Sequence, residues 1–514
     1  MLHVSLIVEA LRAQPRLLFW SATLLQAALW LAVPALFYAA PPGALPVVLA
    51  VGHEWQMGTV FGAPLAFWLA EIAFNAAGGS IVGPYLLSQV CVIVTFWAVF
   101  ALGRSIVGVQ HAVLATLLMG GVLLFSVATP DFGPAVLAMP LTALTLLWFW
   151  RGLGEGRWTA WIAAGVALGL LLLTTPAGLL LASLMAVFTL ATNRGRAALR
   201  TPFPLLAAAL AVTIALPYAL WLRRTGMHLA IGDARLPHSA DLAARLAHWA
   251  ELLGMLVAAH VGFIALVMIA AGRPRRSRVP APAFPRMPVK DFAKTFVLVF
   301  ALAPPLLATL AAALTGRPEP IGGAGWVVVL TGLALVVAVG DVIVLQRQRI
   351  LGYAWLAVVL LPPLATILAL GTAPFVGIDL QANQPARAMA QFFTETFHRR
   401  TNSPLQTVAG DARLASLVAL ESPDRPRVFL DADPRRAAWI DADRVKANGG
   451  IVVWPITDPL GTAPPQVRTQ FPELVAEVPE TFERTIDGSL PPLRLGWGMI
   501  RPQQTEEGAP VAAQ

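Results

Sequence analysis

The stretch HEWQ at residues 53–56 stands between two long hydrophobic runs, and a second carboxylate, Glu71, follows it. An ionised carboxylate without a partner inside a bilayer is destabilising by several kcal/mol, so these residues lie at a water interface or build a site. A carboxylate beside an imidazole can act as a general base or bind a divalent metal ion. Glu54 and His53 are therefore candidate catalytic residues and Glu71 is a secondary candidate. Plain solvation at the interface would also explain Glu54 and Glu71.

A third carboxylate, Asp131, lies in SVATPDFGPAV, where Pro130 and Gly133 break the hydrophobic pattern. This pattern predicts a tight loop between two membrane spans, with the carboxylate at the membrane surface. Asp131 is the third catalytic candidate. The alternative is that it caps the helix that follows.

Two further groups of charged residues could bind ligands. Arg223 and Arg224 directly follow an apolar run, where arginines contact lipid headgroups or clamp the phosphate of a lipid-linked donor. The tail contains DAD twice, at 431–433 and 441–443. A pair of carboxylates in this spacing can hold a divalent metal ion, and it can equally consist of loop and helix-cap aspartates. No cofactor follows from the sequence, and a divalent metal ion remains an open expectation.

These residues need a membrane scaffold to position them. The chain of 514 residues is 57% hydrophobic and 12% charged, with mean hydropathy +0.70, whereas about 25% of the residues of a soluble domain are charged. It carries no continuous basic face, which argues against nucleic-acid binding. Its single cysteine, Cys91, excludes disulfides and Cys-based zinc sites. Eleven apolar runs predict membrane-spanning helices near 18–38, 81–103, 106–128, 133–150, 158–174, 177–192, 203–221, 252–272, 295–315, 324–345 and 350–371.

The loops between these runs differ in charge. With a cytoplasmic N-terminus, the inner segments hold 17 Lys and Arg residues and the outer loops hold five, so this orientation is favoured. The outer loops are then 39–80 and 222–251. Residues 1–371 form the membrane domain, and residues 372–514, which hold 17 of the 28 carboxylates, form a soluble domain outside. Its alternating segments, such as RVFLDA and IVVWPI, predict an α/β domain.

Several of these segments resemble a known family. PDFGPAV at 130–136, GRWTAW at 156–161 and ALGLLLLTTPAG at 167–178 are similar to the membrane-bound GT-C glycosyltransferases of the dolichyl-phosphate-mannose mannosyltransferase-like class, family 39. GTVFGAPLAFWLAE at 58–71 resembles the motif in the first outer loop of that family. The resemblance is strongest to the bacterial lipid A galacturonosyltransferase and aminoarabinose transferase group.

The resemblance implies a polytopic GT-C-like membrane protein that transfers a sugar from a polyprenyl-phosphate donor to a lipid or glycan acceptor. It also implies the bacterial cytoplasmic (inner) membrane, among membrane lipids, and a role in lipopolysaccharide or other envelope glycan synthesis. In this chemistry a carboxylate orients or deprotonates the acceptor hydroxyl and a cation stabilises the departing phosphate. Asp131 matches the family's second-loop aspartate.

The chain departs from the family pattern in the first outer loop. Ala44 occupies the position where an acid is expected, and Gly62 and Ala63 replace a charged pair. Either Glu54, with His53, has taken over the role of the missing acid, or the chain binds lipid-linked sugar without transferring it. A polytopic transporter or flippase is the alternative from another functional class, but the spans contain few charges and no inverted repeat is visible.

Overall fold

The computed structural model describes residues 5–226, 241–272, 282–345, 347–456 and 461–502. Its contacts divide the chain into two compact units. The helical unit is Met1–Leu36 with Phe61–Leu368, and the α/β unit is Phe37–Val60 with Ala369–Gln514. The predicted boundary after residue 371 lies in the last turn of α16, three residues from the boundary that the contacts give after Leu368. The contacts also assign Phe37–Val60 to the second unit, which the sequence-based division placed in the first.

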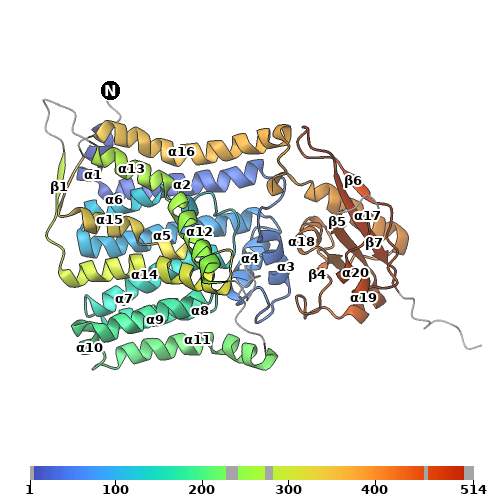
Figure 1. Cartoon of the computed structure of the whole chain (residues 1–514), viewed down its shortest axis with the longest axis horizontal. Helices are drawn as coiled ribbons and strands as arrows, with labels where there is room; N and C mark the ends of the chain where they lie inside the picture. The colour runs from blue at the N-terminus through green and yellow to red at the C-terminus, as the bar shows by residue number, and fades with distance from the viewer. Residues whose placement is uncertain (1–4, 227–240, 273–281, 346, 457–460, 503–514) are drawn as a thin grey trace, which may run out of the picture. The chain divides into compact units, whose positions relative to one another are not determined.

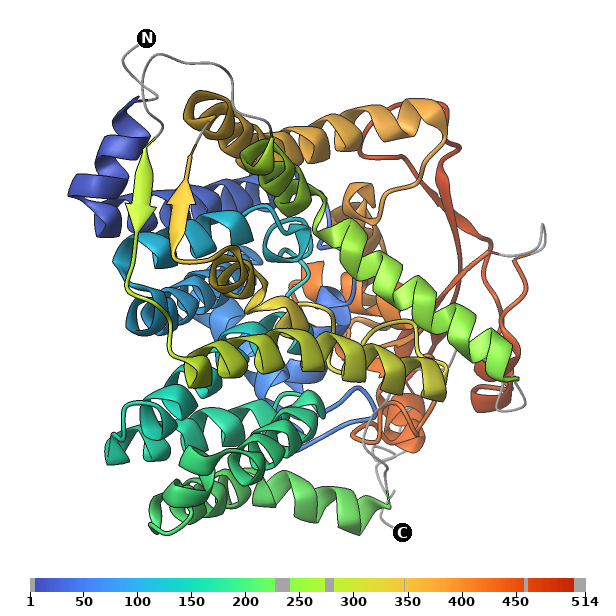
Figure 2. The ribbon, with the colours of Figure 1, turned by 60° about the vertical axis from the view of Figure 1, so that its left-hand side comes forward.

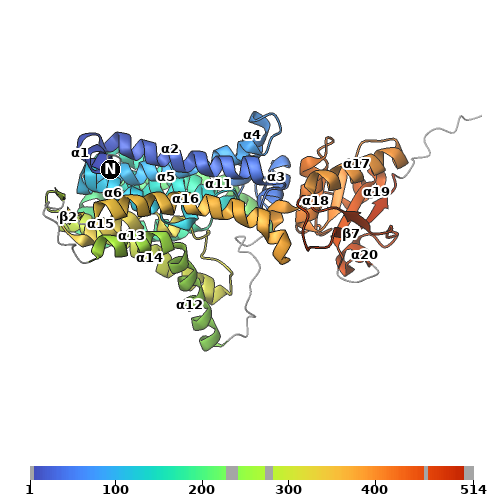
Figure 3. The same cartoon turned by 90° about the horizontal axis from the view of Figure 1, so that it is seen from above.

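The helical unit consists of apolar helices joined mostly by short connections (Figure 1). A small two-stranded antiparallel sheet, β1 with β2, pairs Ala283 with Val344 at one end of the helices (Figure 2). Helix α12 runs obliquely to the long helices (Figure 3). The elements are α1 Ser5–Ala13, α2 Pro15–Phe37, α4 Leu65–Ala76, α5 Val82–Val107, α6 Val109–Met119, η1 Leu123–Phe125, α7 Pro134–Leu153, α8 Trp158–Leu172, α9 Ala177–Ala191, α10 Asn193–Ala198, α11 Phe203–Thr225, α12 Leu242–Ala259, α13 Val261–Ala271, β1 Ala283–Pro285, α14 Asp291–Thr315, η2 Trp326–Val328, α15 Thr331–Val339, β2 Val342–Val344 and α16 Gln348–Thr372.

Every one of the eleven predicted spans contains a helix, but fewer are long enough to cross a membrane. Among the described residues, seven helices have that length and hydropathy, and six shorter apolar helices accompany them. The run 252–272 is interrupted at His260, where α12 ends and α13 begins. The run 106–128 contains only α6 and the short η1, because Gly120 and Gly121 end α6. By helix length and hydropathy, the described residues therefore contain fewer membrane-spanning helices than the eleven that the sequence predicted.

Small residues let these helices pack closely. A Cβ on Gly165 of α8 would lie 2.5 Å from the carbonyl oxygen of Ala207 in α11, and one on Gly332 of α15 would lie 2.2 Å from that of Ala115 in α6. Backbones that approach this closely gain van der Waals contact, which drives helix association in a membrane. Aromatic rings fill the space between α7, α8, α9 and α14, where Phe149 contacts four other rings: Trp161, Phe188, Phe296 and Phe300.

The α/β unit is built on a five-stranded mixed sheet in the order β4-β3-β5-β7-β6. Strands β3, β4 and β5 are parallel, and β7 and β6 are antiparallel. Strand β3 is fully buried and β5 almost so, as central strands covered on both faces should be. The elements are α3 Leu45–His53, η3 Ala373–Val376, η4 Gln381–Asn383, α17 Ala386–Thr401, β3 Thr407–Gly410, α18 Ala412–Glu421, β4 Arg427–Leu430, α19 Ala442–Asn448, β5 Gly450–Pro455, α20 Pro465–Gln470, β6 Glu480–Phe482 and β7 Leu493–Ile500.

Residues 37–60 are fixed to this sheet by backbone and side-chain hydrogen bonds. The amides of Ala39 and Ala40 both donate to the carbonyl oxygen of Ala382, and Arg413 donates to the carbonyl oxygens of Pro41 and Gly43. Helix α3 also packs against α18 and β4. The α/β unit is therefore discontinuous in sequence, and the first outer loop supplies one of its helices.

Candidate functional site

Four connecting segments meet at one end of the helical unit. The amide of Leu65, at the start of α4, donates to the carbonyl oxygen of Leu173 at 3.1 Å. A Cβ on Gly323 would lie 2.5 Å from Cβ of Ala135, and one on Gly322 would lie 2.7 Å from Oγ1 of Thr175. The loop 316–325 thus lies against the beginnings of α7 and α9. We call the segments 61–65, 129–135, 173–177 and 316–325 the loop cluster.

Asp131 belongs to the loop cluster. Two buried glutamines bind the chain that leads into its loop. Gln89 of α5 donates to Oγ1 of Thr129 at 3.1 Å, and Gln26 of α2 donates to the carbonyl oxygen of Phe125 at 2.9 Å. The neighbouring Phe132 is fully buried, whereas Asp131 is half-buried. The N-cap residue of α7 is Gly133, so Asp131 does not stand at the N-cap position that was the alternative.

Glu71 lies in the same unit, in the second turn of α4. It is buried, with 2% of its surface exposed, and Oε1 accepts a hydrogen bond from Nδ2 of Asn75 at 3.2 Å. A buried carboxylate is retained only with polar partners, and Asn75 is one of them. Since α4 starts at Leu65, Glu71 is carried by the helix that leads out of the loop cluster.

Arg317 is a basic residue of the loop cluster that the sequence did not single out. Only 9% of its surface is exposed, its Nε donates to Oγ1 of Thr315 at 2.9 Å, and burial lowers the pKa of the guanidinium. Its carbonyl oxygen contacts Nε2 of His248 at 2.6 Å, and Nδ1 of that ring contacts Glu251. None of the ion pairs among the described residues includes Arg317. A buried cation without a carboxylate is suited to bind an anionic ligand.

Arg223 and Arg224, the predicted phosphate ligands, end helix α11 and are both exposed. The loop that follows them, 227–240, lies outside the described residues, so the predicted outer loop 222–251 is seen only in part. Of these three arginines, Arg317 has the least exposed side chain.

Glu54 and His53 belong to the α/β unit. Glu54 follows the last residue of α3, His53, and its side chain is 5% exposed. Both carboxylate oxygens accept from Nε of Arg427, at 2.9 and 3.0 Å, and Oε2 also accepts from Nη2 at 2.5 Å. This hydrogen bonding raises the pKa of Arg427. A general base needs a free lone pair aimed at its substrate, and here the guanidinium occupies both oxygens.

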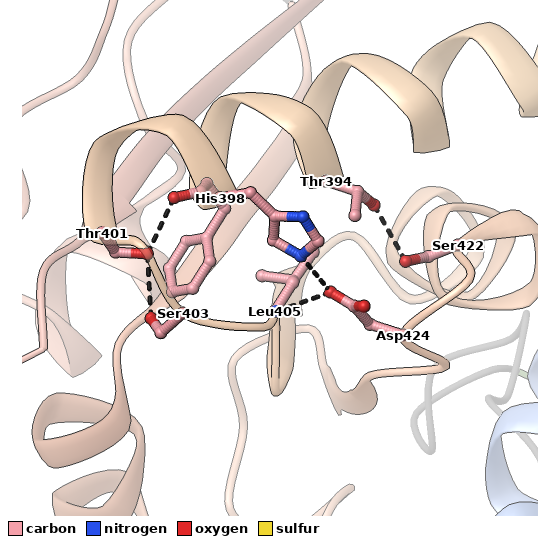
Figure 4. A network of polar contacts seen from close by, with 8 residues as sticks. Thr394, His398, Thr401, Ser403, Leu405, Ser422 and Asp424 are labelled. Carbon is pink, nitrogen blue, oxygen red and sulfur yellow. Dashed lines mark hydrogen bonds and ion pairs between the residues drawn. The ribbon is translucent and has the colours of Figure 1, made fainter.

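A serine, a histidine and an aspartate also lie close together in the α/β unit (Figure 4). Nε2 of His398 contacts Oδ2 of Asp424 at 2.6 Å, but Oγ of Ser403 donates to Thr401 instead of reaching the ring. The amide of Leu405 donates to the same Asp424 oxygen at 2.7 Å. The network connects the end of α17 to the chain entering β3, and it lacks the serine–histidine contact of a nucleophilic triad.

The two DAD segments serve the local backbone. Asp441 caps α19, accepting from the amide of Asp443. Asp431, at φ 52°, accepts from the amide of Ala412 at 3.0 Å and pairs with Arg436, and burial raises the pKa of its carboxyl. Within the described residues no three His, Cys, Asp or Glu side chains gather to hold a metal ion. The described aspartates thus match the loop-and-cap interpretation of DAD.

Residues 62–221 match the family model of dolichyl-phosphate-mannose-protein mannosyltransferase, and this stretch contains Glu71, Asp131 and most of the loop cluster. Among curated proteins, no sequence matches the chain.

Two solved structures share the fold. ArnT from Cupriavidus metallidurans bound to undecaprenyl phosphate superposes with a TM-score of 0.59 at 14% identity, covering 95% of this chain and 99% of ArnT. The same protein in its apo state gives 0.56 at 12% identity with the same coverage. These comparisons confirm the predicted resemblance and fold class. The chain is a polytopic helical protein with the GT-C glycosyltransferase fold of ArnT, and its residues 62–221 match the dolichyl-phosphate-mannose-protein mannosyltransferase family.

Proposed function

We propose that this protein transfers a sugar from a polyprenyl-phosphate donor to a lipid or glycan acceptor. The observation that carries the proposal is the loop cluster, which places a half-buried carboxylate, Asp131, and a buried guanidinium, Arg317, on segments that touch each other. Within the part of the chain that the structure describes, Arg317 has no carboxylate partner. The family match at 62–221 and the GT-C fold support it. The solved structure of ArnT with undecaprenyl phosphate supports the choice of donor class.

The chemistry assigns one task to each group. The acceptor hydroxyl attacks the anomeric carbon, the bond from that carbon to the phosphate oxygen breaks, and the hydroxyl proton passes to a base. Asp131 orients the hydroxyl and takes the proton, which requires a carboxylate within hydrogen-bond reach of the acceptor. Arg317 binds the phosphate, whose negative charge grows as the bond breaks, so a pre-positioned cation stabilises the transition state. Arg223 and Arg224 attract the donor at the surface.

Glu71 and Glu54 take supporting positions in this proposal. Glu71 fixes α4 beside the loop cluster through its buried polar contacts. Glu54 positions α3 on the sheet of the α/β unit, because Arg427 engages both carboxylate oxygens. A catalytic role for Glu54 or His53 remains a prediction. The proposal needs no metal step, and a divalent metal ion remains an expectation from the sequence.

The proposed cellular setting follows the distribution of basic residues. Seventeen cations in the inner segments against five outside favour a bacterial inner-membrane protein whose α/β unit lies outside the cytoplasm. The loop cluster would then lie on the outer side, because α11 and α14 lead to outer loops in that orientation. An acceptor on the outer leaflet, such as a lipopolysaccharide precursor, would be accessible to it.

The experiment is a reconstituted transfer assay read by mass spectrometry. Cells lacking the protein supply extracted envelope glycolipids as acceptors, and cells containing it identify the sugar that is added. Purified wild-type protein with the matching polyprenyl-phosphate sugar should restore that mass, and Asp131→Asn should not. Glu319→Gln, which removes an exposed carboxylate of the same loop cluster, is the matched control. Identical glycolipid profiles in both strains, or full activity of Asp131→Asn, would refute the proposal.

A further inference from the structure

A cavity is formed by the starts of α2 and α6 and by the turn that follows β1, and it shares no residue with the loop cluster. Its lining is mostly apolar but includes Arg16, His111 and Arg286, and we call it the polar cavity for these three side chains. Its volume is about 970 Å³, within the usual range of ligand pockets. Three segments line it. They are the turn between α1 and α2 (Ala13–Leu17), the turn between α5 and α6 (Ile106–His111) and the turn that follows β1 (Pro285–Met287).

Two buried polar side chains that line this cavity lack complete hydrogen bonding. Arg286 has a side chain that is 4% exposed, and His111 is 2% exposed. Asp341 accepts from Nε of Arg286 at 3.3 Å, but Nη1 of Arg286 and Nε2 of His111 have no hydrogen-bond partner among the described residues. Both atoms are themselves buried, so a ligand reaches them only when the two side chains turn toward the cavity. A buried polar group without a partner is costly, and a ligand that supplies acceptors would then stabilise the site. Arg16 adds an exposed second cation to the lining.

The start of α6 contributes to the same cavity. No side chain caps this 11-residue helix, and its first backbone bond runs from the amide of Ala112 to the carbonyl oxygen of Gly108. The preceding amides therefore remain available, and the helix dipole favours an anion there. Gly108 has φ +81°, and a Cβ added to it would meet no atom within 4 Å, so the backbone is open on this side.

An apolar groove continues along the same two helices. Its volume is about 470 Å³, and Leu18, Ala22 and Leu25 of α2 line it together with Leu114 and Leu118 of α6. Arg16 and Ser21 are five residues apart on α2, which is about 8 Å along a helix. The groove also includes Ile343 and Val344 of β2, which pairs with β1, the strand that leads to Arg286. The polar cavity and the apolar groove are thus neighbours along α2 and α6. Their sequence matches a lipid, whose charged headgroup is followed by an acyl chain.

We propose that this pair of sites binds an anionic phospholipid, with its phosphate in the polar cavity and one acyl chain in the groove. Arg286, Arg16 and the amides of α6 match the charge of the phosphate, and the apolar lining of the groove matches the chain. A soluble phosphate ester would fill only the first of the two. The site is independent of the loop cluster, since it shares no residue with the segments 61–65, 129–135, 173–177 and 316–325.

The test measures lipid binding to the purified full-length chain in lipid-free detergent. Dioleoylphosphatidylglycerol, dioleoylphosphatidylcholine and inorganic phosphate are titrated separately, and native mass spectrometry counts the bound molecules. We expect phosphatidylglycerol to bind at least several-fold more tightly than phosphatidylcholine. Arg286→Gln should weaken phosphatidylglycerol binding about tenfold and Arg16→Gln severalfold, as expected for lost charge-assisted hydrogen bonds.

Two further variants separate the possible ligands. Arg349→Gln removes an exposed charge at the start of α16 that lines neither cavity, so it should leave binding unchanged. Leu25→Trp narrows the groove, so it should weaken phosphatidylglycerol binding without affecting inorganic phosphate. If Arg349→Gln weakened phosphatidylglycerol binding as much as Arg16→Gln does, the binding would be a nonspecific attraction to surface charge. That result would overturn the proposed site. Tight binding of inorganic phosphate with no response to Leu25→Trp would identify a soluble anion and overturn the lipid. Since Arg16 is exposed, its variant tests the site even if Arg286→Gln fails to fold.

Discussion

Glu54 and Arg427 stand 373 positions apart in the sequence and are joined by three hydrogen bonds between a carboxylate and a guanidinium. This contact holds the end of α3 against β4. It connects the HEWQ stretch at residues 53–56 to the sheet of the α/β unit. It also supplies a physical reason for a carboxylate in so apolar a sequence.

Removing either partner should therefore affect stability. Arg427→Met leaves the buried carboxylate unpaired and should reduce the free energy of unfolding by about 3 kcal/mol, whereas Glu54→Gln should reduce it by about 1–2 kcal/mol. The double variant should be more stable than Arg427→Met alone. Chemical denaturation of the full chain in detergent measures all three. Loss of sugar transfer in Glu54→Gln at unchanged stability would instead show a catalytic role.

Asp131→Asn should lower the rate of sugar transfer by a factor of about 10²–10⁴, which is the usual contribution of a general base. Its thermal stability should stay close to that of the wild type, because Gln89 and Gln26 hold the loop through other residues. Turnover at saturating donor, alongside thermal unfolding, separates the two effects. A variant that is equally inactive but unfolds many degrees earlier would assign Asp131 to the structure of the loop.

Arg317→Met should raise the KM for the donor about 10- to 100-fold, since it removes charge-assisted hydrogen bonds to the phosphate. Without donor the same variant should unfold at a higher temperature than the wild type, because a buried cation has been removed. Arg223→Gln and Arg224→Gln, which alter exposed side chains, should change KM only severalfold. If Arg317→Met has the KM of the wild type, the phosphate binds elsewhere.

Gly323→Ala should disturb the loop cluster. Its φ of +87° disfavours a side chain, and the new Cβ would meet Cβ of Ala135 at 2.5 Å, so we expect about 2 kcal/mol of destabilisation and reduced transfer. Gly78→Ala is the control, since it has φ +70° but no atom within 4 Å. Equal activity of the two variants would show that contact with Ala135 does not position the site.

The stability of the chain should depend on pH through Asp431. Burial raises the pKa of this carboxyl in the folded protein above the usual value of about 3.9, so the folded state holds the proton more tightly than the unfolded state. Its favourable contribution is complete below pH about 3.9 and is lost as the pH rises through the raised pKa. Asp431→Asn should therefore gain stability relative to the wild type as the pH rises from the unperturbed value through the raised pKa of Asp431, and it should keep that gain above it. Asp443→Asn, at an exposed position, should show no such trend in thermal unfolding.

The sequence predicted the elements best where one local pattern determined them. The strands at 427–430 and 450–455 lie where the apolar segments RVFLDA and IVVWPI placed them. Strands β6 and β7 were not anticipated, because LRLGWGMI contains two glycines and forms a strand through its pairing with β5. Long apolar runs predicted helices correctly but not their lengths, since a break such as that at His260 depends on packing against neighbouring helices.

The site was only partly predictable for a similar reason. Asp131 was found from its Pro-Asp-Phe-Gly loop, and the structure shows that loop in contact with others. Arg317 was counted as one of five outer cations, and nothing in GRPEP distinguishes it until its burial is known. Glu54 was selected because it is acidic in an apolar context, but its partner Arg427 is separated from it by most of the chain. Contacts of this range carry no local sequence signal.

The split composition of the α/β unit sets an order of events during synthesis. Residues 37–60 emerge early, yet the sheet that receives them begins only after residue 369. Helix α3 docks on α18 and β4, which are complete only at residue 430, so at about 5–20 residues per second roughly 20–75 s pass before it can dock. During that interval Glu54 has no guanidinium and the apolar face of α3 is uncovered. We therefore expect this segment to stay exposed in newly made chains until the C-terminal part is complete, and a chain truncated before residue 427 would lack the guanidinium that pairs with Glu54.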